Sequence, residues 1–269
     1  MTLADLASGG LMNTQQFNTF YRMVQDEPTI IKDARNVPMQ SDSMKIEKIG
    51  FGSRILRAGK EATPLADSDR ARPTTDKVEL TAKEVIAEVN ISYDTLENNI
   101  EGANLQNTIM QMISQRAALD IEELVLNGDT SSSDPYLKLI DGIIKQSTSH
   151  ISDNASAAIA KEMFKKAQKL IPSKYIRDPL AWRYYLSNNA TLEWKDAVAT
   201  RQTNLGDTAL QGGMSTAYGI PVQGIAMLQP FSDGGSPAKQ VTNGLLIHPK
   251  NIVLGFSRNV RVEVDKDIR

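Results

Sequence analysis

Residues 104–130 read NLQNTIMQMISQRAALDIEELVLNGDT and form the longest periodic segment of the chain. Its apolar residues recur at i, i+4, i+7 and i+8, the spacing that places side chains on one side of an α-helix. They are Leu105, Ile109, Met112, Ile113, Ala117, Ile121, Leu124 and Val125. The pattern predicts one long helix that begins near Leu105 and runs into Asn127. About 23 residues at ~1.5 Å each span roughly 35 Å, so we expect this helix to be the spine of the molecule.

The helical pattern runs into Asn127, Gly128 and Asp129, which could form a ligand loop or simply end the helix. Asn and Gly suit the left-handed conformation that commonly ends a helix, because glycine has no Cβ to clash. A helix C-terminus carries a partial negative charge and is the wrong end for phosphate. We therefore interpret Asn127 and Gly128 as a helix stop, followed by an exposed connector at residues 130–134.

Several carboxylates near this helix end raise the question of acid/base catalysis. They are Asp120, Glu122, Glu123 and Asp129. A close pair of carboxylates, as in glycosidases, stays open as an alternative. Because Glu122 and Glu123 lie on adjacent but different faces of a helix, a solvated surface is the favoured interpretation.

The composition limits the remaining function classes. The chain has 269 residues, 41% of them hydrophobic, which is enough for a substantial core. A net charge of -2 argues against non-specific nucleic-acid binding. There is no cysteine, so thiolate zinc sites and cysteine nucleophiles are excluded, and no run approaches the ~20 apolar residues of a membrane helix. The two histidines, His150 and His248, are expected in surface turns, and we predict no metal and no cofactor.

The N-terminal third predicts an arm followed by a long hairpin. Residues 1–43 mix helical and proline-bearing pieces that cannot bury a core alone. Residues 44–57 look extended, and alternation in residues 83–92 predicts a second strand with one buried face. The charged, proline-containing residues 58–76 between them have little to bury. Compact domains seldom carry so long a loop without an external role, so we infer a projecting hairpin.

Residues 141–235 alternate helix and strand. A helix within residues 157–171 should end at Pro172, and residues 179–187 should form a buried strand. Asn188 or Asn189 is expected to cap the next helix, which runs through residues 190–199. The remaining segments are a polar loop at residues 201–219 and strands within residues 220–228, 243–256 and 259–265. The fold class is α+β.

Several segments of the sequence, in order, resemble those of a known protein family. The segment VIAEVNISYDTLENNIEGANLQNTIMQMISQRAALDIEELVLNGD, residues 85–129, is similar to a stretch shared by the major capsid proteins of tailed bacteriophages with the Hong Kong 97 fold. The segments AWRYYLSNNATLEWK, GGMSTAYGIPVQGIAML and GLLIHPKNIVLGFSRNVRVEVD resemble later parts of that family in the same order. The resemblance covers roughly residues 44–265 and depends on the order and spacing of these segments.

The resemblance implies an architecture and a function. It assigns an N-terminal arm (1–43), an extended loop (44–91), a peripheral domain (92–140 and 236–269) and an axial domain (141–235). In the family, such subunits assemble into the hexamers and pentamers of an icosahedral shell that encloses double-stranded DNA. The chain is then a structural protein of the virion, not an enzyme, and assembles in the host cytoplasm. Its partners would be many copies of itself, a separate scaffolding protein, a portal and decoration proteins, with no membrane.

Intersubunit contacts are expected in the extended loop and in the loop that would face the capsomer axis. The candidate residues are Arg54, Arg57, Lys60, Arg70, Arg72, Asn204, Gly212 and Gly213. Some family members join loop lysines covalently to neighbours, but no motif around Lys60 supports this, and we interpret it as a solvated lysine. The chain ends before the family's last strands, which suggests a truncation, and a start at Met1 suggests that this end is not processed.

Two alternatives stay open. An encapsulin-like nanocompartment shell would have the same fold and a pocket for cargo instead of a virus. An acid/base hydrolase would be a small monomer with two close carboxylates in a pocket. The state of assembly separates the hydrolase from both shells.

Overall fold

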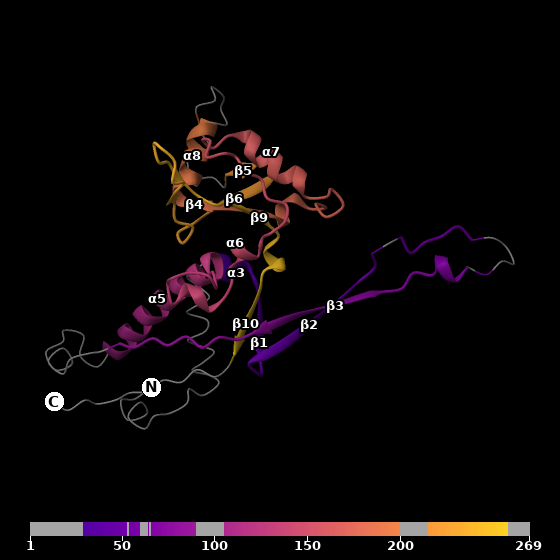
Figure 1. Cartoon of the computed structure of the whole chain (residues 1–269), viewed down its shortest axis with the longest axis horizontal. Coiled ribbons are helices and arrows are strands. Elements are labelled where there is room, and N and C mark those ends of the chain that lie inside the picture. The colour runs from indigo at the N-terminus through magenta and orange to yellow at the C-terminus, as the bar shows by residue number, and fades with distance from the viewer. Residues whose placement is uncertain are drawn as a thin grey trace. The chain divides into compact units, whose positions relative to one another are not determined.

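The computed structural model describes residues 29–52, 54–59, 64, 66–89, 105–199 and 215–257 (Figure 1). The chain divides into two compact units. The first comprises Met1–Asn36, Ile86–Leu254 and Arg261–Arg269, and the second comprises Val37–Val85 and Gly255–Val260. Among the described helices, none is long and apolar enough to cross a membrane.

The first unit contains helices and a four-stranded sheet. Its α-helices are α3 (Thr29–Asp33), α5 (Leu105–Asn127), α6 (Ile143–Gln146), α7 (Lys161–Leu170) and α8 (Asn188–Ala199). Its 3-10 turns are η3 (Leu137–Leu139), η4 (Pro179–Ala181) and η5 (Pro249–Asn251). Its strands are β4 (Arg183–Ser187), β5 (Thr216–Ala217), β6 (Ile220–Ile225), β7 (Phe231–Ser232), β8 (Gln240–Val241) and β9 (Leu245–Ile247). This mixture agrees with the predicted α+β class.

The sheet has the strand order β5-β6-β4-β9. Strand β4 is parallel to β6 and antiparallel to β9, and β5 pairs antiparallel with β6. Both central strands are largely buried, and β6 lies within the strand predicted in residues 220–228. The strand predicted in residues 179–187 is confirmed only from Arg183 onward, because residues 179–181 form η4. Successive side chains of a strand point to opposite faces, so β4 supplies neighbouring tyrosines to two separate cores.

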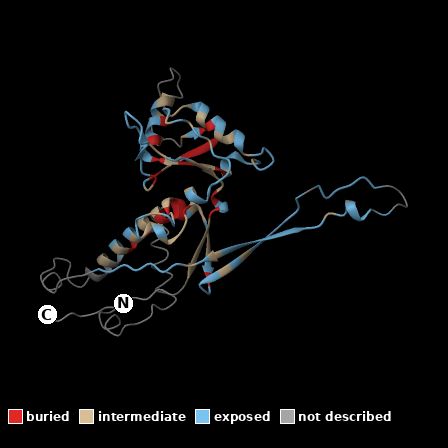
Figure 2. Cartoon of the chain, viewed as in Figure 1, coloured by how far each residue is buried: buried red, intermediate tan, exposed pale blue. Residues whose placement is uncertain are grey.

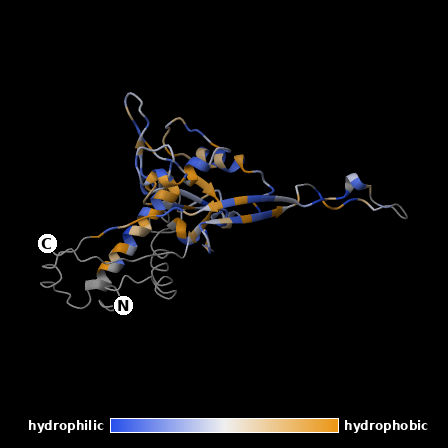
Figure 3. Ribbon diagram, turned by 60° about the horizontal axis from the view of Figure 1, so that its bottom comes forward, coloured by the Kyte–Doolittle hydropathy of each residue, from blue (hydrophilic) through white to orange (hydrophobic). Residues whose placement is uncertain are grey.

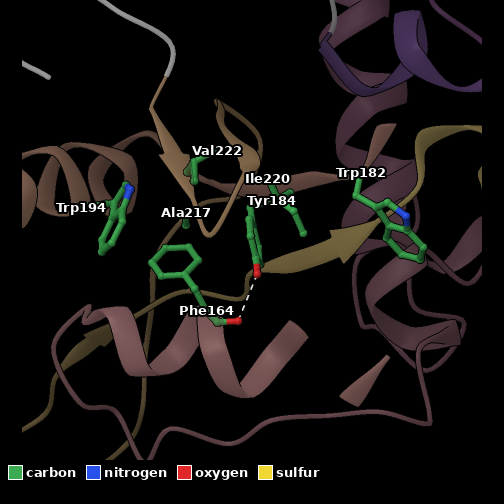
Figure 4. Packing of buried hydrophobic residues seen from close by; sticks show 7 residues of the cluster. All are labelled: Phe164, Trp182, Tyr184, Trp194, Ala217, Ile220 and Val222. Carbon is green, nitrogen blue, oxygen red and sulfur yellow. Dashed lines mark hydrogen bonds between the residues drawn. The ribbon is translucent and has the colours of Figure 1, made fainter. Parts of the chain in front are cut away.

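Tyr184 belongs to the first core (Figure 4), with Phe164, Trp182, Trp194, Ala217, Ile220 and Val222. The Phe164 ring meets Tyr184 edge-on at a centroid distance of 4.9 Å and lies 4.5 Å from the Trp194 ring. The Tyr184 hydroxyl donates a hydrogen bond of 3.0 Å to the Phe164 carbonyl, which satisfies its polar end inside the core. Burial raises the pKa of Tyr184 to about 12, so the hydroxyl stays a donor.

Tyr185 belongs to the second core, with Ile30, Leu126, Ile225, Leu228 and Ile252. Ile225 lies on β6 an odd number of residues from Ile220 and Val222, which explains why it faces this core and not the first. Ile30 comes from α3, so residues of the proposed arm take part in the core.

Helices α7 and α8 confirm two predictions and correct one. Helix α7 ends at Leu170, just before Pro172, and buries Phe164. Helix α8 covers the predicted residues, but Asn188 and Asn189 do not cap it. The cap is Ser187, whose Oγ accepts a hydrogen bond of 3.1 Å from the Ala190 amide. The prediction failed because three consecutive residues were all good caps, and only the end of β4 decides which one precedes the first turn.

The spine helix is confirmed as α5, but its most buried line differs from the predicted stripe. Met112 is 63% exposed, whereas Ser114, Ala118 and Glu122 are buried at 1%, 0% and 2%. These three residues are spaced four apart, so they form one line on the helix surface. Figure 3 shows hydrophobic and hydrophilic residues along α5. This line carries small and polar side chains before it reaches the buried Leu126, so the spacing of large apolar residues does not reveal it.

The end of α5 is the expected helix stop, but with another geometry. Gly128 does not adopt a positive φ, so the predicted left-handed cap is wrong. Glycine is needed there for space: a Cβ would lie 2.5 Å from the Ile140 carbonyl oxygen and 2.6 Å from that of Leu124. Gly142 passes equally close, and its amide donates to the Gly128 carbonyl at 2.8 Å. Because Gly128 and Gly142 have no side chains, the backbone around residue 142 can lie in direct contact with the backbone at the end of α5.

The second unit contains a two-stranded sheet of β1 (Arg35–Met39) and β10 (Val253–Ser257) and a hairpin of β2 (Ser43–Gly50) and β3 (Thr74–Thr81). The unit boundary falls within β1 and β10. The hairpin was predicted, but its second strand is β3 and not residues 83–89, and residues 90–92 of the predicted strand lie outside the described residues. In that range Val85, Ile86 and Val89 are 50%, 83% and 53% exposed and form no strand. Their alternation did not reflect a buried face within this chain.

Candidate assembly surface

The β2–β3 hairpin has two different faces. Directly paired residues of an antiparallel ladder lie on the same face. The pairs Met44 with Leu80 and Ile46 with Val78 make one face apolar near the base, and the charged pair Lys48 with Asp76 follows on the same face. The pairs Lys45 with Glu79 and Glu47 with Lys77 make the other face charged, and the second of these forms an ion pair of 3.3 Å. The hairpin is thus amphipathic over the pairs next to its base, whereas Ile49 lies on the same face as Lys45 and Glu47.

The base of the hairpin is packed within the second unit. A Cβ at Gly255 of β10 would meet the Met39 sulfur and would lie 3.2 Å from Leu80 Cδ1. Met39 is 1% exposed, and the Ala82 amide donates to the Asp42 carbonyl at 2.8 Å. These contacts hold β1, β10 and the first pairs of the hairpin together.

Away from its base the hairpin exposes apolar side chains. Figure 2 shows β2, β3 and the segment that joins them almost entirely as exposed. We call the following residues the hairpin apolar set: Ile49 (67% exposed), Phe51 (54%), Ile55 (52%), Leu56 (82%) and Val78 (50%). A two-stranded hairpin alone is marginally stable in water, and monomers rarely gather large exposed apolar side chains in one segment. This segment is therefore a surface that another molecule can cover.

The predicted contact residues of the extended loop lie in the same segment. Arg54, Arg57 and Arg72 are exposed. Arg70 forms an exposed ion pair of 2.8 Å with Asp67, in the 3-10 turn η1 (Asp67–Asp69). Lys60, Asn204, Gly212 and Gly213 lie outside the described residues. The contact residues predicted from the sequence were charged ones, and the apolar set was not predicted, although Ile55 and Leu56 are adjacent apolar residues in a polar segment.

Two of the candidate carboxylates, Glu122 and Asp120, are held in contacts within the chain. Glu122, which was expected on a solvated surface, is buried at 2% and accepts a hydrogen bond of 3.0 Å from the Ile30 amide. Asp120 forms an ion pair of 2.9 Å with Arg116. Within the described residues, no group of three or more His, Asp or Glu side chains is arranged to hold a metal ion.

Asp129 and Asp141 organise the turn after α5. Asp129 accepts hydrogen bonds from the Ser131 amide and hydroxyl at 2.8 and 2.7 Å and from Lys145 at 3.2 Å. These bonds, those of Ser131 first, lower the pKa of Asp129 to about 2. Asp141 accepts from the amide and hydroxyl of Thr130, which lowers its pKa as well. Both carboxylates serve the turn geometry.

The histidines have local roles. His150 is exposed, has a φ of 60° and lies 3.1 Å from the Ser149 hydroxyl. His248 accepts from the Lys250 amide at 3.3 Å at the start of η5 and packs edge-on against Trp182. Both lie in turns, as predicted.

Comparison with known proteins shows the family to which the chain belongs. No family model matches the sequence. A curated protein of Bacillus subtilis (strain 168), "Putative prophage capsid protein YqbE", is 60% identical over 270 residues, covering 100% of this chain and 87% of that protein. A chain of the solved structure "Satellite phage P4 procapsid including size determination (Sid) protein" has a TM-score of 0.53 at 13% identity and covers 95% of this chain and 96% of that chain. A chain of the bacteriophage PhiM1 mature capsid has a TM-score of 0.47 at 14% identity, covering 83% and 72%.

The mixed helix and sheet fold is thus one found in a phage procapsid. With 60% identity along the whole chain, the protein belongs to the family of bacteriophage capsid proteins. It is a structural protein of the virion, as the resemblance implied.

Proposed function

We propose that this chain is the subunit of an icosahedral shell that is built from hexamers and pentamers and encloses double-stranded DNA. The observation that carries the proposal is the hairpin apolar set, which a capsid subunit would cover with neighbouring copies. A shell subunit needs self-complementary surface and no catalytic centre, in keeping with the structural roles of Glu122, Asp129 and Asp141.

The domain assignment of the Hong Kong 97 fold is part of this proposal. It makes residues 1–43 an N-terminal arm, 44–91 an extended loop, 92–140 with 236–269 a peripheral domain, and 141–235 an axial domain. Supporting features are the amphipathic hairpin β2–β3 inside the second range and the spine helix α5 inside the third.

The charged residues of the hairpin would make contacts at the rim of these interfaces. Arg54, Arg57, Arg70 and Arg72 lie in the segment that carries the hairpin apolar set, together with Lys60 in the sequence. Exposed ion pairs contribute little affinity, about 0–1 kcal/mol, so they would select the partner's orientation while the apolar side chains supply the free energy. Asn204, Gly212 and Gly213 are proposed as contacts around the capsomer axis.

The charge of the chain supports enclosure of DNA without specific binding. A net charge of -2 leaves no overall attraction for phosphates, so the DNA would be driven in by other proteins. The proposed partners are a separate scaffolding protein, a portal and decoration proteins, with assembly in the host cytoplasm. The hairpin apolar set fits a nanocompartment shell as well as a capsid, but the capsid relative favours the capsid, and no contact among the described residues favours the hydrolase.

Electron microscopy of the purified full-length chain tests the proposal. Closed shells, rings or sheets with fivefold and sixfold units are expected at micromolar concentration, alone or with the phage's scaffolding protein. A uniformly monomeric protein in both conditions would contradict it. Nucleic acid inside particles isolated from lysogenic cells separates a virion from a nanocompartment.

A further inference from the structure

Helix α3 is held on the first unit by contacts that its own sequence cannot replace. It has five residues, far fewer than the 12–15 that an isolated helix needs for even marginal stability in water. Ile30 and Ile31 are both completely buried, and the Arg35 amide donates to the Ile252 carbonyl at 2.9 Å. Whether α3 forms therefore depends on its surroundings.

The first polar contact comes from the spine helix. Ile30 is the second residue of α3, so its amide has no partner within the helix. The Glu122 side chain accepts from this amide at 3.0 Å across 92 residues of sequence. A buried carboxylate is costly to keep, and an apolar residue of similar volume at position 122 would fill the space at lower cost. The carboxylate thus points to a role beyond packing.

The second polar contact comes from the sheet. The hydroxyl of Tyr185 on β4 donates to Asp33 Oδ2 at 3.1 Å, at the other end of α3. Burial, and next the nearby Asp33, raise the pKa of Tyr185, so its hydroxyl keeps the proton that it donates. One contact secures the start of α3 and the other its end.

We propose that Glu122 and Tyr185 form a latch that keeps α3 on the first unit and thereby fixes the point at which residues 1–28 are attached. Both contacts are side-chain hydrogen bonds, so α3 can be released without breaking the backbone ladders of α5 or β4. In a capsid subunit the latch would determine where the N-terminal segment meets neighbouring copies; this consequence, unlike the latch itself, rests on the proposed function.

Hydrogen–deuterium exchange of the full-length, unassembled chain tests the latch. In Glu122→Met, which keeps the volume and removes the acceptor, amides of residues 29–36 should exchange about tenfold faster or more, since the buried Ile30 amide loses its acceptor. Tyr185→Phe should accelerate the same amides to a smaller extent. Glu122→Gln keeps an acceptor oxygen and should stay within about twofold of the unaltered chain, as should the neighbouring control Glu123→Gln.

Two outcomes would overturn the latch. The first is equal exchange of residues 29–36 in Glu122→Met and the unaltered chain. The second is an equal loss of protection in α3, α5 and β4 together, which would make Glu122 a general core residue. Exchange is measured on unassembled chain, so the latch and the proposed assembly can fail independently.

Discussion

The four-stranded sheet of the first unit and the β2–β3 hairpin of the second use the same kinds of residues in opposite ways. Tyr184, Tyr185 and Ile220 are at most 3% exposed. Ile49, Leu56 and Val78 are 50% to 82% exposed. Since apolar burial is the main source of stability, the sheet stabilises the subunit, and the hairpin carries apolar surface that becomes stabilising only when covered.

The largest loss of stability is expected from a substitution in the core that packs on the four-stranded sheet. Trp194→Ala removes an indole that is 4% exposed and packs on Phe164. Among the described residues its Nε1 has no hydrogen-bond partner, so the loss is one of packing. The free energy of unfolding, measured by denaturant titration, should fall by about 3–5 kcal/mol. On the same helix, Leu192→Ala removes a side chain that is 67% exposed and should change it by less than about 0.5 kcal/mol.

A glycine-to-alanine substitution in each unit should change the free energy of unfolding by different amounts. In Gly128→Ala the new Cβ would press on the backbone oxygens of Ile140 and Leu124, at 2.5 and 2.6 Å. Backbone atoms yield little, so we expect a loss of about 2–3 kcal/mol in denaturant titration. At Gly59, in the hairpin segment, a Cβ would meet nothing within 4 Å. Gly59→Ala should leave stability unchanged or raise it by up to ~1 kcal/mol, and equal losses at both sites would refute the close-approach account.

A smaller effect tests the start of α8. Ser187→Ala deletes the oxygen that accepts from the Ala190 amide, and caps of this kind contribute about 1 kcal/mol. A lower thermal midpoint is expected for Ser187→Ala and an unchanged one for Asn189→Ala. The reverse result would restore the cap predicted from sequence.

The smallest effect concerns pH. The pKa of Asp129 falls from 3.8 to about 2 in the folded chain. A lowered pKa contributes stability above about pH 4, and this contribution is lost as the pH falls through about 2. Thermal midpoints measured from pH 5 to pH 2 should drop less steeply in Asp129→Asn than in the unaltered chain. Parallel curves would show that Asp129 does not contribute.

What the sequence predicted well was local. Helices α5 and α7 follow from the spacing of apolar residues and from Pro172, information contained within each segment. The burial of Glu122 was not predictable in this way, because its partner Ile30 lies 92 residues earlier. A polar residue at a buried position gives no periodic signal until the element that satisfies it is known.

The hairpin shows that an exposed strand is equally hard to predict from the sequence. Strand β3 has the sequence TTDKVELT, which pairs along its full length with β2 and is exposed at seven of eight positions. Because β3 has no buried face, its sequence gave no strand pattern, and the alternating residues 83–92 were predicted as the second strand instead. The predicted contact residues show the same limit. Arg54 and Arg72 were predicted because they are charged, whereas Leu56, which is 82% exposed, was not predicted. A subunit that completes its packing on neighbours breaks the rule that apolar residues mark the inside.

Sedimentation velocity with electron microscopy on a hairpin variant tests whether the hairpin apolar set drives assembly. The variant combines Ile49→Ser, Leu56→Ser and Val78→Ser, and its control changes the charged face by Lys45→Ser with Glu79→Ser. We predict that the variant stays a small species with the thermal midpoint of the unassembled chain, because its core is untouched, while the control forms large particles. Particles formed by the variant as readily as by the unaltered chain would contradict the claim that the hairpin apolar set is covered by neighbouring copies.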